Sequence, residues 1–148
     1  MRNCIRMVIL STLCVFAIIC TGFVCSAERV NQCEYIEIIE LIALVTMAEA
    51  EGECEEGKRL VIDTILNRVD SVYFPDTVHG VIYQANQFSS MWNGRVDKCF
   101  VDDDICQLVE EELQSRTNVD TIFFTAGGYG KYGTPMFQVG NHYFSSYE

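Results

Sequence analysis

IIELIALVTMAEAEG, residues 38–52, is the segment from which the architecture of this chain is best inferred. Its apolar residues recur with the i, i+3, i+4, i+7 spacing of an amphipathic helix, and they are Ile38, Leu41, Ile42 and Val45. We therefore expect a helix over residues 34–50 that packs one face into a core.

Two more helices are predicted to follow. Residues 56–71 repeat the same spacing with Ile62, Ile65, Leu66 and Val69. The connection at residues 52–54 is short, so these first two helices should pack as neighbours. A third helix should begin at the acidic run 102–104, with Ile105, Leu108, Val109 and Leu113 as its apolar face. Between them, Asp76 is expected to cap a short helix that ends at Tyr83.

Strand-like segments come last. They are Thr121–Thr125 and Met136–Phe144, on either side of a glycine-rich loop at residues 126–133. The predicted fold class is therefore α+β, mainly helical with a small C-terminal antiparallel β-sheet.

Residues 1–27 read as a secretory signal peptide. Arg2 and Arg6 are followed by an uncharged run from Met7 to Val24, and Cys25-Ser26-Ala27 supplies small residues for cleavage. An uncleaved membrane anchor is the alternative, because the apolar run is almost long enough to span a bilayer. The prediction is a secreted or wall-associated protein with one domain at residues 28–148.

The charge of that domain excludes some partners. Without the two leader arginines it has 8 basic and 21 acidic residues, a formal net charge of −13. Such a chain is repelled by nucleic acid and by anionic lipid, so we expect neither as a partner, and membrane contact only through an uncleaved leader.

Four cysteines remain outside the leader: Cys33, Cys54, Cys99 and Cys106. An even number in an exported chain predicts disulfides, with three possible connectivities. A Cys99–Cys106 bridge together with Cys33–Cys54 is one of them. No zinc-binding spacing is present, so neither a metal nor another cofactor is predicted.

Glu49 is the candidate catalytic residue. It lies eleven residues after Ile38, a rotation within about 20° of the apolar stripe, and at the last turn of the predicted helix. An apolar environment and the negative end of a helix both favour the neutral acid form of a carboxyl group. A carboxylic acid that can donate a proton is what glycosidic bond cleavage requires. The alternative is an ordinary solvated glutamate.

The same residues resemble a known family. Met47–Glu53, Ile65–Val69, Gly80–Gln84, Asn93–Arg95 and Gly140–Phe144 are similar, in this order, to the catalytic domain of SleB-type cell-wall hydrolases, the spore cortex-lytic enzymes. The resemblance implies a lysozyme-like fold and a monomer that acts on peptidoglycan glycan strands. This sequence departs from the family pattern at Glu51, where an arginine is common.

The resemblance also implies a mechanism and a cleft. Glu49 would protonate the oxygen between N-acetylmuramic acid and N-acetylglucosamine and then act as base, which gives a 1,6-anhydro sugar as in a lytic transglycosylase. Hydrolysis with a second carboxylate remains open. The predicted substrate-binding residues are Glu53, Gln87, Phe88, Ser89, Asn141, His142 and Tyr143.

Three other functions compete with this one. They are an inactive wall-binding module, a secreted disulfide-stapled interaction protein, and an amidase or peptidase that cuts the stem peptide. The last is disfavoured because only two histidines are present to build a zinc or cysteine–histidine centre.

Overall fold

The computed structural model describes residues 31–147, so the predicted leader at residues 1–27 lies outside the described residues. The chain divides into two compact units at residue 38, and the second, Ile38–Glu148, carries all the predicted site residues. Residues 31–37 are helical, and residues 38–50 form the first helix of the second unit. The remaining elements are α2 (Glu55–Asp70), α3 (Val78–Ile82), the 3₁₀ turns η1 (Ser89–Met91) and η2 (Val96–Lys98), α4 (Asp103–Gln114), β1 (Phe123–Ala126), β2 (Thr134–Val139) and β3 (His142–Ser146).

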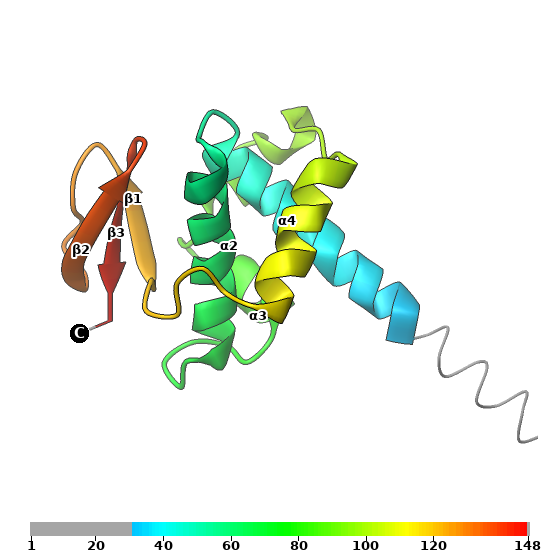
Figure 1. The fold of residues 1–148 in the computed structure, drawn as a ribbon, viewed down its shortest axis with the longest axis horizontal. Coiled ribbons are helices and arrows are strands. Elements are labelled where there is room, and N and C mark those ends of the chain that lie inside the picture. Colours follow the sequence, from blue (N-terminus) through cyan, green and yellow to red (C-terminus); the bar gives the residue numbers. More distant parts are fainter. Residues whose placement is uncertain (1–30, 148) are drawn as a thin grey trace, which may run out of the picture. The chain divides into compact units, whose positions relative to one another are not determined.

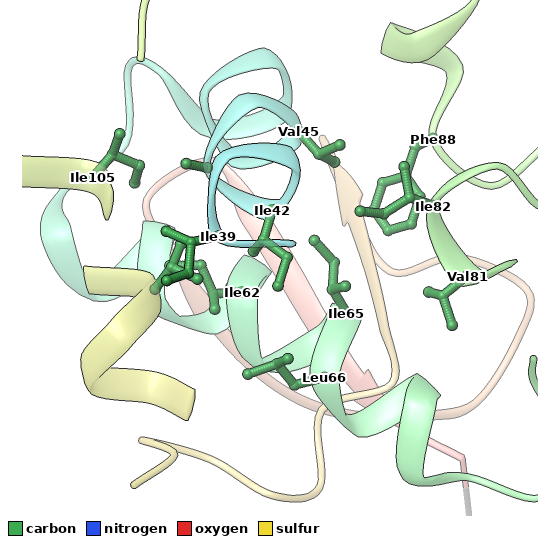
Figure 2. Packing of buried hydrophobic residues seen from close by; sticks show 12 residues of the cluster. Ile39, Ile42, Val45, Ile62, Ile65, Leu66, Val81, Ile82, Phe88 and Ile105 are labelled. Carbon is green, nitrogen blue, oxygen red and sulfur yellow. The ribbon is translucent and has the colours of Figure 1, made fainter. Parts of the chain in front are cut away.

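The first helix and α2 both occur where the apolar spacing predicts them. Helix α2 lies between α4 and strand β1 and contacts both (Figure 1). Buried side chains from the first helix, α2, α3 and α4 pack together with Phe88 (Figure 2). The inward stripe of the first helix is centred on Ile39, Ile42 and Val45, while Ile38 and Leu41 are only partly buried.

Helix α4 (Asp103–Gln114) begins at the predicted acidic run, but its predicted apolar face needs a correction. The Asp102 side chain accepts a hydrogen bond from the Ile105 backbone N–H, as expected of an acidic N-cap. Leu113, however, is 37% exposed, whereas Glu112 is 1% exposed. A charged residue takes the inward position because it has a strong partner there: Arg59 Nη1 lies 2.8 Å from Glu112 Oε1.

Glu112 is part of a buried polar network between α2 and α4. Arg59 also pairs with Glu55 and Glu111. Asp63 is fully buried and accepts a hydrogen bond from the Asn118 backbone N–H at 2.7 Å. Burial, and then the neighbouring Glu112 carboxyl, raise the pKa of Asp63 to about 8.

The short helix α3 is capped by Thr77, whose side chain accepts from the Gly80 backbone N–H, so the cap predicted at Asp76 is wrong. Gly80 has no room for a side chain, since a Cβ would lie 2.6 Å from Pro75. This contact fixes the direction of the chain before α3.

The C-terminal strands form one antiparallel sheet in the order β1-β3-β2. The segment predicted as a single strand, Met136–Phe144, is instead a hairpin that turns at Gly140-Asn141. Gly140 has φ +57°, a left-handed conformation that favours glycine, and this allows the tight turn. The predicted α+β class is confirmed.

The predicted disulfides are absent from the described residues, where all four cysteines are free thiols. Cys99 donates its thiol hydrogen to the Arg95 carbonyl, whereas Cys106 packs against the hydrophobic core. These two side chains therefore have different local partners. Cys33 donates to Glu37 on its own helix, and Cys54 is exposed at the start of α2.

Candidate active site

Glu49 lies at the last turn of the first helix, with its side chain half-buried. Seven residues after the buried Ile42, it projects from the inward side of the helix, as predicted. The Ser90 hydroxyl donates a hydrogen bond to Glu49 Oε1 at 2.5 Å. No residue among 31–147 donates to Oε2, so one oxygen is held and the other is free to act on a ligand.

Ser90 is a site residue that the sequence did not indicate. It is 4% exposed and lies in the middle of η1, between Ser89, which is exposed, and Met91, which is partly buried. The neighbouring Phe88 is inserted in the core, and the 3₁₀ turn then points Ser90 inward. Ser89, predicted to contact substrate, is exposed one position away, and its carbonyl accepts the backbone N–H groups of Trp92 and Asn93.

Glu53 clamps the sheet to the end of the first helix. Its Oε1 accepts from the Asn141 side-chain amide at 2.9 Å, and its Oε2 accepts from the Asn141 backbone N–H at 3.1 Å. The amide hydrogen bond is the main reason that the pKa of Glu53 is lowered. A Cβ on Gly140 would fall on this carboxylate, so the glycine leaves the space that the clamp occupies. Glu53 therefore orders the loop, and the Asn141 donor is engaged with it.

Two of the predicted substrate-binding residues are buried instead. Phe88 is 1% exposed, with its ring centroid 6.3 Å from that of Phe124. His142 is 6% exposed and packs against Phe124 and Phe144, with centroid separations of 5.1 and 6.1 Å. Neither ring presents an exposed face in this structure, so a direct sugar contact by either stays a prediction that these positions do not support.

Gln87 and Tyr143 both line a pocket of about 430 Å³ beside the sheet. The Tyr143 ring packs edge-on against Tyr129, with 5.1 Å between centroids. The complete lining is Arg68, Asn86, Gln87, Phe123, Phe124, Thr125, Gly130, Tyr132, Tyr143 and Ser145. Glu49 is not among these residues, so the candidate catalytic carboxyl does not line this pocket. Residues 87–90 connect the two, because Gln87 lines the pocket and Ser90 binds Glu49.

Glu51, at a position where the family pattern commonly has arginine, forms an ion pair with Arg95. Arg95 Nη2 lies 2.8 Å from Glu51 Oε2, and Arg95 Nε donates to the Ala48 carbonyl at 3.4 Å. The pair ties the segment before η2 to the end of the first helix. The exposed Trp92 precedes this segment and packs edge-on to Tyr83.

Comparison with known families gives a match over most of the second unit. The model of the Cell Wall Hydrolase family matches residues 52–145. The chain belongs to this family. The match begins three residues after Glu49, so it covers the Glu53 clamp, Ser90 and the pocket, but not Glu49 itself.

Curated relatives are similar over a shorter stretch. The chain is 43% identical over 58 residues to a spore cortex-lytic enzyme of Oceanobacillus iheyensis, a stretch of 39% of this chain and 21% of that protein. It is 38% identical over 58 residues to a spore cortex-lytic enzyme of Bacillus subtilis, again 39% of this chain and 19% of that protein. The similarity thus spans about a fifth of the relatives' length.

Solved structures agree on the fold. The catalytic domain of the Bacillus cereus SleB protein matches with a TM-score of 0.65 and 24% identity, over 74% of this chain and 89% of that chain. The catalytic domain of a germination-specific lytic transglycosylase SleB from Bacillus anthracis matches with a TM-score of 0.65 and 23% identity, over 74% and 93%. The predicted fold is therefore confirmed by these structures, and the predicted family is confirmed by the family-model match.

Proposed function

We propose that this chain cleaves the glycan strands of peptidoglycan, with Glu49 as the catalytic acid and base. The observation that carries the proposal is the Glu49 carboxyl, half-buried at a helix end, with one oxygen held by Ser90 and the other free. Membership of the cell wall hydrolase family supports peptidoglycan as the substrate class.

The proposed reaction is a lytic transglycosylation. Glu49 donates its proton to the oxygen between N-acetylmuramic acid and N-acetylglucosamine, and the bond from that oxygen to the muramic C1 breaks. The resulting carboxylate then takes the proton of the muramic 6-hydroxyl while that oxygen bonds to C1. The products are a 1,6-anhydro end and a free N-acetylglucosamine hydroxyl, with Glu49 protonated again.

A single carboxyl suffices for this route, which fits the local geometry. An inverting or retaining glycosidase uses two carboxyl groups across the bond. The next two glutamates in the sequence are already engaged, since Glu53 is bound to Asn141 and Glu51 to Arg95. Both engagements favour the anhydro route over hydrolysis.

The proposed place of action is outside the cell membrane. Residues 1–27 would direct export, and the domain would then act on the wall as a monomer. Its acidic charge disfavours adhesion to anionic lipid, so wall contact would come from the site itself.

The test is to digest purified peptidoglycan with the full chain and with Glu49→Gln, and to identify the fragments by mass spectrometry. Gln keeps the shape and can still accept from Ser90, but it has no transferable proton. We expect anhydro-muramic ends from the wild type only. Reducing ends would replace the transglycosylase route by hydrolysis, and an intact glycan with a folded wild type would favour the wall-binding module.

A further inference from the structure

Arg68 is a buried cation for which residues 31–147 supply no counter-ion. It is 5% exposed, and its Nε donates to the Ile122 carbonyl at 2.8 Å. Its guanidinium carbon lies 5.2, 5.3 and 5.8 Å from the ring centroids of Phe74, Phe88 and Phe123. Among residues 31–147, Nη1 has no hydrogen-bond partner and no carboxylate forms an ion pair with the group.

The other arginines of the described region all have such a partner. Arg59 pairs with three glutamates, Arg95 with Glu51 and Arg116 with Asp70. Aromatic rings stabilise a cation but accept few of its hydrogen bonds, and a buried charge without a partner is costly. Burial lowers the pKa of Arg68 to about 10, so the group is still charged at neutral pH.

Arg68 also lines the 430 Å³ pocket beside the sheet, and the chemistry of that pocket is unusual for this chain. The protein has 21 acidic and 10 basic residues, yet the pocket lining contains no Asp or Glu. Lys131 is not a lining residue, but its Nζ lies 4.7 Å from the ring centroid of the lining residue Tyr132. The rest of the lining is mostly aromatic, hydroxyl-bearing or amide-bearing, which is typical of a ligand site of this size.

We propose that this pocket binds a carboxylate, and that in peptidoglycan the carboxylate belongs to the stem peptide. A carboxylate would supply the acceptor and the counter-ion that the guanidinium lacks, while the tyrosine rings contact the attached chain. The identity of the ligand rests on the proposed function, whereas the carboxylate chemistry rests on the pocket itself. The pocket would thus select glycan strands that still carry peptides.

The test uses small probes that differ in one charge. Muramyl dipeptide carries a single carboxylate, on its second amino acid, and its carboxamide analogue carries none. We would titrate each into the full chain and follow binding by calorimetry. A charge-assisted contact in a partly enclosed site predicts that the carboxylate probe binds roughly 10- to 100-fold more tightly. Equal affinities, or no binding of either probe, would overturn the proposal.

A third probe and two variants locate the contact. N-acetylmuramic acid carries its carboxylate on the lactyl group, and tighter binding of this sugar than of muramyl dipeptide would move the contact from the peptide to the sugar. Arg68→Gln should abolish the preference for the charged dipeptide but keep the affinity for the amide. Lys98→Gln, a control at an exposed residue that removes one positive charge, should leave the preference intact.

The outcome remains decisive if Arg68→Gln does not fold, because the two dipeptide probes compare affinities on the wild type alone. It is also separable from the proposed function. If the wild type binds the two dipeptide probes equally but still cleaves glycan, only the carboxylate site is refuted. Cleavage failure with a preserved preference would refute only the enzymatic proposal.

Discussion

Replacing Gly140 by alanine should destabilise the protein mainly through Glu53. An L-residue at φ +57° costs roughly 1–2 kcal/mol. The new Cβ would also displace the Glu53 carboxylate, which loses two hydrogen bonds from Asn141. These bonds are partly exposed, so together they contribute about 1–2 kcal/mol. The expected total for Gly140→Ala is about 2–4 kcal/mol of unfolding free energy.

A double-mutant cycle isolates the clamp. In a Glu53→Ala background, Gly140→Ala should cost only the backbone term of about 1–2 kcal/mol, so the two changes should couple by about 1–2 kcal/mol. Gly127→Ala is the matched control, because Gly127 has φ +78° and a Cβ added there would meet nothing within 4 Å. Its cost should be the same in both backgrounds.

Urea unfolding of the four cycle members and the two control variants gives these values. Additivity of Glu53→Ala and Gly140→Ala to within about 0.5 kcal/mol would refute the clamp, since independent sites behave in that way. Coupling at Gly127 as large as at Gly140 would refute the steric part of the reasoning.

Three further predictions concern the polar groups of the core and the site. Ser90→Ala should lower kcat about tenfold, because it removes the hydrogen bond to Glu49, and steady-state rates with an unchanged melting temperature would show it. Arg59→Met should cost about 3–5 kcal/mol by leaving the buried Glu112 carboxylate unpaired, whereas Arg95→Met should cost less than about 1 kcal/mol, and comparable losses in chemical denaturation would contradict this ranking. Asp63 has its pKa raised on folding, so its contribution is complete below about pH 4 and is lost as the pH rises through about 8. Asp63→Asn should therefore remove a decline in stability between these pH values, and a melting profile as pH-dependent as the wild type's would exclude that role.

The helices could be predicted because their apolar spacing is long and regular. The stripe that contains Ile42 and Val45 fixes both the first helix and the inward position of Glu49. The exchange of Leu113 for Glu112 on α4 could not be foreseen, since it depends on Arg59, more than fifty residues away in the sequence. Tertiary pairing there overrides the local pattern.

The sheet and the site were less predictable for different reasons. Gly140-Asn141 is a recognised hairpin signal, so the turn between β2 and β3 was available in the sequence and was missed. Ser90, by contrast, lies in an irregular segment where no periodicity distinguishes it from Ser89. The burial of His142 arises from contacts across the folded sheet, which local sequence does not encode.

The disulfide prediction failed because it rested on the number of cysteines and on export. Neither property places two Cβ atoms at bonding distance, which is a requirement of the folded geometry. In the structure Cys106 is part of the core packing and Cys99 contacts the Arg95 carbonyl, so each of these two cysteines has a local partner.

The central claim is that Glu49, and no neighbouring glutamate, carries the chemistry. The most direct measurement is the rate at which soluble fragments are released from purified peptidoglycan by the full chain and by Glu49→Gln, Glu53→Gln and Glu56→Gln. Glu56 is exposed and serves as the matched control. We predict a loss of roughly 10²- to 10⁴-fold for Glu49→Gln, a smaller loss for Glu53→Gln, and an unchanged rate for Glu56→Gln. A folded Glu49→Gln variant that keeps the wild-type rate, with activity abolished by Glu53→Gln instead, would contradict the account.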